Sequence, residues 1–243
     1  MDVARAVHTA LFGIYPYLAL SVLLLGSLVR YDRAGYTWQS DSSQLLRARQ
    51  LRLGSNLFHS GVLIVVAGHF FGFLLPEPWI GWALSPAQHQ LVAMVAGGTA
   101  GAVAILGLSI LLQRRLADPR IRRNSRFWDI AVVLMLWLQL ALGLLTVPVS
   151  AQHLDGRLFL TLTDYVKGIV TLQGGVADLL WATPWVFRLH ILLGFTLFLV
   201  APFTRLVHIW SGFATLAYLF RPYQIVRSRR RLLRPAYHRA RRS

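Results

Sequence analysis

Four of the eight histidines in the chain lie inside long apolar stretches, where ionisable side chains are rare. His59 and His69 share the second such stretch, and His190 and His208 share the fifth. An ionisable residue inside a bilayer is costly and usually marks a functional site. One such histidine could equally be a hydrogen-bond partner for a neighbouring helix, but four on only two stretches favour ligation of a metal or a cofactor.

The rest of the composition narrows the chemistry of these histidines. Cysteine is absent, which excludes disulfides, iron–sulfur ligation, thiolate catalysis and covalent c-type haem. Zinc requires three or four protein ligands, and neither stretch contains an acidic residue. Haem iron takes four nitrogens from its porphyrin and needs two axial ligands, which a pair of histidines supplies. Six-coordinate iron has no open position, so the sequence predicts haems that carry electrons and do not bind oxygen.

The elements that must position the histidines are apolar stretches long enough to cross a membrane. A hydrocarbon core of about 30 Å requires about 20 apolar residues in a helix. Five stretches qualify, at 10–29, 56–75, 91–112, 130–149 and 189–209. Because 56% of the residues are hydrophobic and the charges cluster between these stretches, we expect an all-α integral membrane protein with five transmembrane helices. Pro202 lies inside the fifth stretch and predicts a bend there, since proline removes a helical hydrogen bond.

The basic residues predict the orientation of the chain. Lysine and arginine number 25 against 9 acidic residues, for a net charge of +16, and 21 of the 25 lie after the first and third stretches or at and beyond the exit of the fifth. Short loops rich in Lys and Arg stay in the cytoplasm, so the N-terminus is expected outside and the C-terminus inside. We expect residues 1–226 to form the membrane domain and 227–243 a basic cytoplasmic tail that binds anionic lipid. No nucleic-acid partner is expected, because nucleic-acid-binding domains carry basic residues on scaffolds of ordinary hydropathy.

The directions of the helices predict how the histidines pair. The second and fifth stretches run in opposite directions, which pairs His59 with His208 near the cytoplasm and His69 with His190 near the outer face. The spacings within the two stretches correspond to ~15 Å and ~27 Å of helical rise, which implies metal centres about 20 Å apart. Close approach of a porphyrin requires small residues, and the candidates on these two helices are Gly61, Gly68, Gly72 and Gly194.

Several ordered strings of residues add a resemblance to a known family. They are Ile14-Tyr-Pro-Tyr17, Arg30-Tyr-Asp32 with Tyr36-Thr-Trp38, Ser55-Asn-Leu-Phe-His59, Gly68-His-Phe-Phe-Gly72, Ala141-Leu-Gly-Leu-Leu-Thr146, Ser150-Ala-Gln-His153, Phe187-Arg-Leu-His190 and Arg205-Leu-Val-His-Ile-Trp-Ser211. Together these strings resemble the gamma subunit, a dihaem cytochrome b, of the membrane-bound respiratory nitrate reductase. The resemblance covers roughly residues 12 to 228.

The resemblance implies a membrane anchor in the bacterial inner membrane that draws on the quinol pool. It would oxidise quinol near the outer face and pass electrons through two b-type haems to a cytoplasmic iron–sulfur subunit, which feeds a molybdenum-containing catalytic subunit that reduces nitrate. It also implies the same ligands, His69 with His190 for the outer haem and His59 with His208 for the inner haem. Two alternatives stay open: a related dihaem subunit of another cytoplasmic reductase, such as one for sulfur compounds, and a haem-free anchor or transporter.

Three further residues are candidates for the site, Gly68 and His89 from the resemblance and Arg205 from its position three residues before His208. The family binds quinol beside the outer haem, near the glycine that corresponds to Gly68. An ungapped placement puts His89 where the family has a lysine, and histidine titrates near neutral pH, so His89 is a candidate acceptor of the quinol proton; a solvated loop histidine is the equal alternative. Arg205 is a candidate partner for a propionate of the inner haem or for lipid headgroups. His8, near the N-terminus, is expected to be solvated.

Overall fold

The structure, a computed structural model, describes residues 2–34, 47–76, 84–123, 125 and 127–210. In these residues it contains helices and turns but no strand. Five helical segments are long and apolar enough to cross a membrane, which confirms the prediction of five spans: Val3–Arg33, Ala48–Leu74, Pro86–Ala117, Phe127–Ser150 and Trp185–Phe203. The predicted boundary at residue 226 and the basic tail lie outside the described residues.

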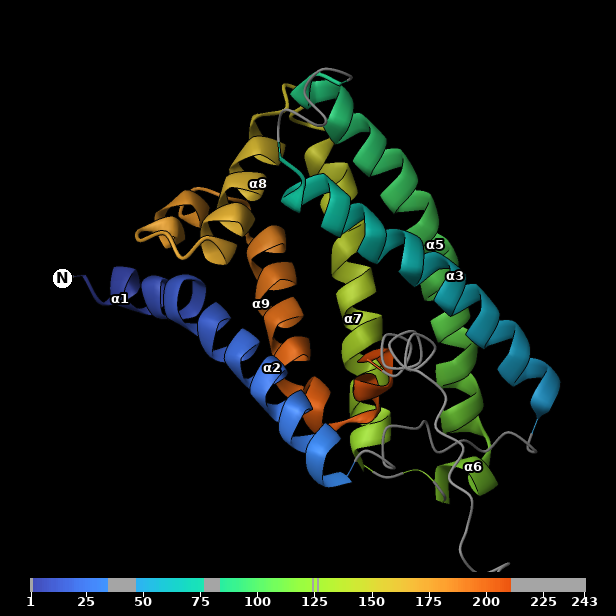
Figure 1. Cartoon of the computed structure of the whole chain (residues 1–243). Helices are drawn as coiled ribbons and strands as arrows, with labels where there is room; N and C mark the ends of the chain where they lie inside the picture. Colours follow the sequence, from blue (N-terminus) through green and yellow to red (C-terminus); the bar gives the residue numbers. More distant parts are fainter. Residues whose placement is uncertain (1, 35–46, 77–83, 124, 126, 211–243) are drawn as a thin grey trace, which may run out of the picture. The chain divides into compact units, whose positions relative to one another are not determined.

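The long helices pack side by side in the order α2, α9, α7, α5 and α3 (Figure 1). Their bounds are Tyr15–Ala34 for α2, Ala48–Leu74 for α3, Pro86–Ala117 for α5, Phe127–Ser150 for α7 and Trp185–Val200 for α9. In the part of the chain that the structure describes, α3 packs along α5, whereas α9 packs against α7 and α2, so α3 and α9 are not packed against each other along their lengths.

Glycines allow α3 and α5 to pack backbone against backbone. A Cβ atom at Gly61 would meet the backbone of Ala100 and Ala104, and a Cβ atom at Gly107 would meet the backbone nitrogen of Phe58 and the carbonyl oxygen of Gly54. Each of these contacts is closer than real Cβ atoms approach. Because small residues let helix backbones approach within a membrane, these positions fix the register of α3, and therefore the heights of His59 and His69.

The helix α5 starts earlier than its apolar stretch, and local capping explains the difference. Ser85 is the N-cap, and its side chain accepts a hydrogen bond from the backbone of Gln88 while the Gln88 side chain accepts one from the Ser85 backbone. Pro86 occupies the first helical position, where its missing N–H costs nothing. This capping box places His89 in the first turn of α5 and not in a loop.

The first span contains a π-helical turn, Ala10–Ile14, between α1 (Val3–Thr9) and α2. Pro16 has no N–H to donate to the carbonyl of Phe12, one turn earlier. The hydroxyl of Tyr165 donates to that carbonyl instead, at 2.9 Å. Tyr165 belongs to α8 (Arg157–Val170) and is fully buried, and burial raises the pKa of its phenol, which therefore stays neutral. This hydrogen bond ties α8 to the first span.

The expectation that His8 is solvated is wrong. His8 is 6% exposed, and its Nε2 lies 2.8 Å from the carbonyl oxygen of Ala177 in the 3₁₀ turn Val176–Leu180. Its ring packs against Phe12 and Trp181. The reason is that α1 continues the first span and packs on the segment that follows α8, so a position near the terminus is covered by residues distant in sequence.

The fifth span is interrupted as Pro202 predicts. The α-helix α9 ends at Val200, and two 3₁₀ turns follow, Ala201–Phe203 and Arg205–Val207, separated by Thr204 in an extended conformation. His208 comes directly after the second turn. His190 therefore lies within α9, whereas His208 begins a new helical segment on the other side of the break.

Candidate functional site

The structure brings the four intramembrane histidines together in two pairs. His69 of α3 and His190 of α9 have ring centres 6.1 Å apart, and we call them the distal pair. His59 of α3 and His208 have ring centres 6.3 Å apart, and we call them the proximal pair. These are the pairs that antiparallel helices predict from the sequence.

The spacing within each pair fits two axial ligands of one metal ion. A bond from a metal to an imidazole nitrogen is about 2.0–2.1 Å long and that nitrogen lies roughly 1.1 Å from the ring centre, so two rings on opposite sides of one ion have centres about 6.2–6.4 Å apart. Both observed spacings are within about 0.2 Å of this range. Within the described residues there is no group of three or more histidine, aspartate or glutamate side chains that could hold a metal. The donor set therefore suits haem, which brings four ligands of its own.

The imidazoles of α3 are oriented by the backbone of their own helix. Nδ1 of His59 lies 2.8 Å from the carbonyl oxygen of Ser55, and Nδ1 of His69 lies 2.8 Å from that of Val65, each one turn earlier. A histidine that donates through Nδ1 keeps Nε2 available as a metal ligand. Both side chains are exposed although they lie on an apolar helix.

Residues of α7 surround the ring of His190 instead. Gln139 donates from Nε2 to the carbonyl oxygen of His190 at 3.1 Å and also lies 3.5 Å from its Nε2. A Cβ atom at Gly143 would lie 3.0 Å from Cε1 of the ring. In the described part of the chain, Nδ1 of His190 has no hydrogen-bond partner. The sequence gives no sign that Gly143 makes room for this ring.

A row of aromatic rings connects the distal pair with His89. The ring of His69 lies 5.6 Å from that of Phe73, which stacks at 5.8 Å on Phe159 of α8, and Phe159 lies 4.5 Å from His89. The His89 side chain is half-buried. A Cβ atom added at Gly72 of α3 would lie 3.8 Å from its Nε2. His89 therefore lies in a helix at the distal end of the site, which does not match the alternative of a solvated loop histidine.

Two neighbours complete the distal end. Gln90 is 3% exposed and donates from Nε2 to the carbonyl oxygens of Ser150 and His153 at 3.0 and 2.7 Å. It thereby joins the start of α5 to the end of α7 and fixes the position of His89. Gly68 is exposed, and a Cβ atom there would have no neighbour within 4 Å. Whether Gly68 and His89 contact quinol stays a prediction.

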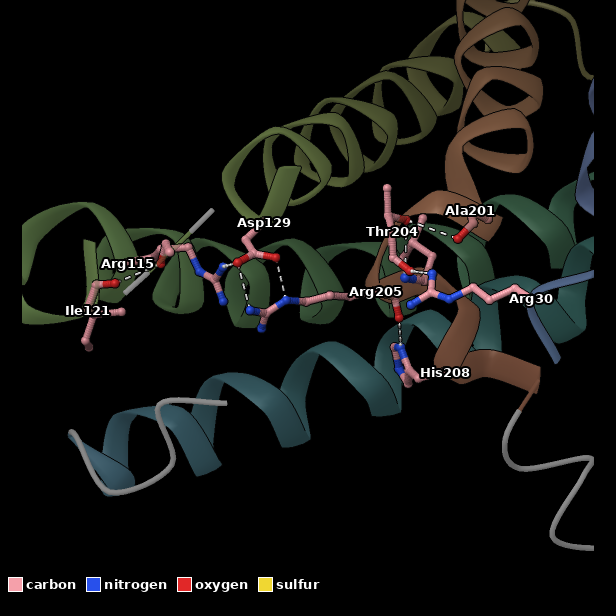
Figure 2. Close-up of polar contacts among 10 residues, drawn as sticks. Arg30, Arg115, Ile121, Asp129, Ala201, Thr204, Arg205 and His208 are labelled. Atoms are coloured by element: carbon pink, nitrogen blue, oxygen red, sulfur yellow. Dashed lines mark hydrogen bonds and ion pairs between the residues drawn. The ribbon is translucent and has the colours of Figure 1, made fainter. Parts of the chain in front are cut away.

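Charged residues gather at the proximal end, beside His208 (Figure 2). Arg205 binds both carboxylate oxygens of Asp129 of α7, with Nε 2.5 Å from Oδ1 and Nη2 2.8 Å from Oδ2. Nη1 of Arg115 in α5 lies 3.9 Å from Oδ2 of the same carboxylate. The contact of Arg205 with a haem propionate stays a prediction. Asp129 is not predictable as a site residue, because its one signal in the sequence is an acidic residue directly before an apolar stretch.

Comparison with known proteins identifies the family of the chain. The model of the family described as nitrate reductase gamma subunit matches residues 8–229. Respiratory nitrate reductase 1 gamma chain of Escherichia coli (strain K12) is 47% identical over 219 residues, which cover 90% of this chain and 96% of that protein. The nitrate reductase gamma chain of Bacillus subtilis (strain 168) is 37% identical over 223 residues, 90% of this chain and 97% of that protein. The resemblance of the sequence strings is thereby confirmed, and the chain belongs to the nitrate reductase gamma subunit family.

Proposed function

We propose that this chain is the quinol-oxidising, membrane-anchoring dihaem cytochrome b subunit of a respiratory nitrate reductase in a bacterial inner membrane. Its electrons go to a cytoplasmic iron–sulfur subunit and from there to a molybdenum-containing subunit that reduces nitrate. The observation that carries this proposal is the pair of ring spacings, 6.1 Å and 6.3 Å, between histidines of two separate spans. Membership of the nitrate reductase gamma subunit family supports it.

The four histidines hold two b-type haems, His69 with His190 at the distal site and His59 with His208 at the proximal site. When bound, each haem supplies a one-electron redox centre within the membrane. The backbone hydrogen bonds at Nδ1 of His59 and His69 orient these ligands before any haem is bound, and the glycine contacts between α3 and α5 fix their heights.

His89 accepts a proton from quinol at the distal end, beside Gly68. Its contact with Phe159 and the anchoring of Gln90 hold the imidazole at a fixed place near the distal pair. With the N-terminus outside, the distal end faces the outer surface and the protons of quinol are released there. Moving two electrons inward across the full membrane potential conserves up to about 4.6 kcal/mol per quinol at 100 mV.

Two assays on the complete complex in membranes test the proposal. Nitrate reduction is measured with a quinol as donor, and also with a soluble reductant that delivers electrons directly to the partner subunits. The variant His190→Ala is expected to abolish the first activity and to keep the second, because it removes a haem ligand and leaves the catalytic subunit intact. Equal quinol-dependent rates in His190→Ala and the unaltered complex contradict the proposal.

A further inference from the structure

The break in the fifth span exposes backbone groups that a continuous helix would satisfy. Within the segment Ala201–Val207, α9 gives way to two 3₁₀ turns separated by an extended residue, so the regular hydrogen bonding of an α-helix is interrupted there. Arg30, from the last two turns of α2, donates from Nη1 to the carbonyl oxygens of Pro202 and Thr204, at 2.7 and 2.9 Å. One side of the break is therefore held by a cation from another helix (Figure 2).

The other side of the break is held by Asp129. Its carboxylate is 8% exposed and binds the guanidinium of Arg205 through both oxygens. A bidentate pair of this kind fixes orientation as well as distance, because the planar guanidinium matches the carboxylate. Arg205 is in turn the first residue of the 3₁₀ turn that precedes His208. Asp129 thus fixes the side chain of Arg205, whose backbone is part of the break in the fifth span.

The backbone of Arg205 leads directly to the proximal imidazole. Nδ1 of His208 lies 2.6 Å from the carbonyl oxygen of Arg205, three residues earlier. His59 and His69 use the equivalent carbonyl of an unbroken helix, four residues earlier, so their orientation follows from the helix itself. At His208 the helix α9 has already ended and a new helical segment is only beginning, so the acceptor carbonyl belongs to the preceding 3₁₀ turn, which tertiary contacts must hold.

We propose that Asp129, acting through Arg205, is a positioning residue that orients the imidazole of His208 toward the proximal haem. This inference rests on the proposed function, because it takes His208 as an axial ligand. The carboxylate of Asp129 holds the 3₁₀ turn Arg205–Val207 in place, where a continuous helix would otherwise do so. It also separates two cations, since Arg115 lies 3.9 Å from the same carboxylate; without the negative charge, Arg205 and Arg115 repel each other and the turn moves.

The experiment uses the haem-loaded complex in membranes and reads the low-spin electron paramagnetic resonance signals and redox potentials of the two haems. The variants His208→Ala and His190→Ala first assign each signal to a site. Asp129→Asn removes the charge, Arg205→Lys keeps the charge but loses the bidentate geometry, and Asp129→Glu keeps the carboxylate. The matched control is Asp118→Asn, which removes a carboxylate at the same end of the bundle that pairs with Arg47 at 3.0 Å and not with the break.

We expect Asp129→Asn and Arg205→Lys to lose at least half of the proximal low-spin signal, or to shift its position and potential, while the distal signal stays unchanged. Asp129→Glu should recover most of the proximal signal, and Asp118→Asn should resemble the unaltered complex. Proximal signals that are unchanged in both variants overturn the inference, and so does an equal loss of both haems in both variants, which indicates a role in folding alone. An unaltered complex without any low-spin signal overturns the proposed function as well, so the two failures are distinguishable.

Discussion

The substitution Gly143→Ala tests the distal site with a single methyl group. Gly143 of α7 faces the ring of His190, and a Cβ atom there would lie 3.0 Å from Cε1, 3.6 Å from Nδ1 and 3.8 Å from Nε2. Ordinary contacts of Cβ atoms lie at 3.4–4 Å. The imidazole must therefore withdraw by a few tenths of an ångström to restore a normal contact. The backbone of His190 has little freedom to follow, since Gln139 donates to its carbonyl at 3.1 Å.

The expected magnitude follows from the cost of overpacking and from the short range of a metal–ligand bond. Forcing an extra methyl group into a packed site costs about 1–3 kcal/mol, and ligand distances tolerate only about ±0.2 Å. A ring displaced by more than this tolerance loses part of its bond to iron. We therefore expect haem affinity at the distal site to fall by about 5- to 150-fold, the ratio that corresponds to 1–3 kcal/mol.

The assay compares haem content and the reduced-minus-oxidised spectrum of the Gly143→Ala complex with those of Gly97→Ala. Gly97 of α5 is the matched control, because a Cβ atom there would meet nothing within 4 Å. We expect Gly143→Ala to lose distal haem selectively when haem is limiting, and Gly97→Ala to retain both haems. Full occupancy and an unchanged distal spectrum in Gly143→Ala would refute the reasoning.

Three further predictions address the quinol end, the α8 contact and the α3–α5 interface. His89→Ala should slow quinol oxidation with both haem spectra intact, and His89→Lys should retain activity, with the exposed His153→Ala as control; an unchanged rate in His89→Ala rejects the role. Tyr165→Phe leaves the Phe12 carbonyl without its donor and should lower the free energy of unfolding by about 1–3 kcal/mol. Burial raises the pKa of the Tyr165 phenol, so the folded chain keeps a proton that the unfolded chain releases above about pH 10. Thermal stability should therefore fall as the pH rises beyond that value, and it should fall less in Tyr165→Phe. Equal pH profiles of the two proteins contradict this. Gly107→Ala should prevent stable assembly, measured as loss of folded chain from membranes, because its Cβ would overlap the backbone of α3, whereas normal yields would show that the helices separate freely.

The spans and the histidine pairs were predictable because both follow from properties that act along the chain. Apolar length determines the five spans, and alternation of direction between spans decides which histidines can meet. The bounds of α5 were less predictable, since the capping box at Ser85 extends the helix beyond its apolar core. The prediction of a solvated His8 is wrong because the burial of its side chain depends on Ala177 and Trp181, which are distant in sequence.

The supporting residues of the site could not be predicted, because their roles exist only in tertiary contacts. A carboxylate directly before an apolar stretch, such as that of Asp129, has the sequence signature of a surface residue, yet it is buried against Arg205. A glycine within an apolar stretch, such as Gly143, has the signature of general helix packing, yet it faces one particular imidazole ring. Ligand residues can be recognised in a sequence by their type, whereas the residues that orient them are of common types and can be recognised only by their position in the fold.

The central claim, two haems each held between α3 and the fifth span, is tested most directly by haem quantification and a reduced-minus-oxidised absorption spectrum of the purified chain. The account predicts two b-type haems per chain, both low-spin, with loss of one in His190→Ala and of the other in His208→Ala. A colourless chain after expression with ample iron and porphyrin would contradict it.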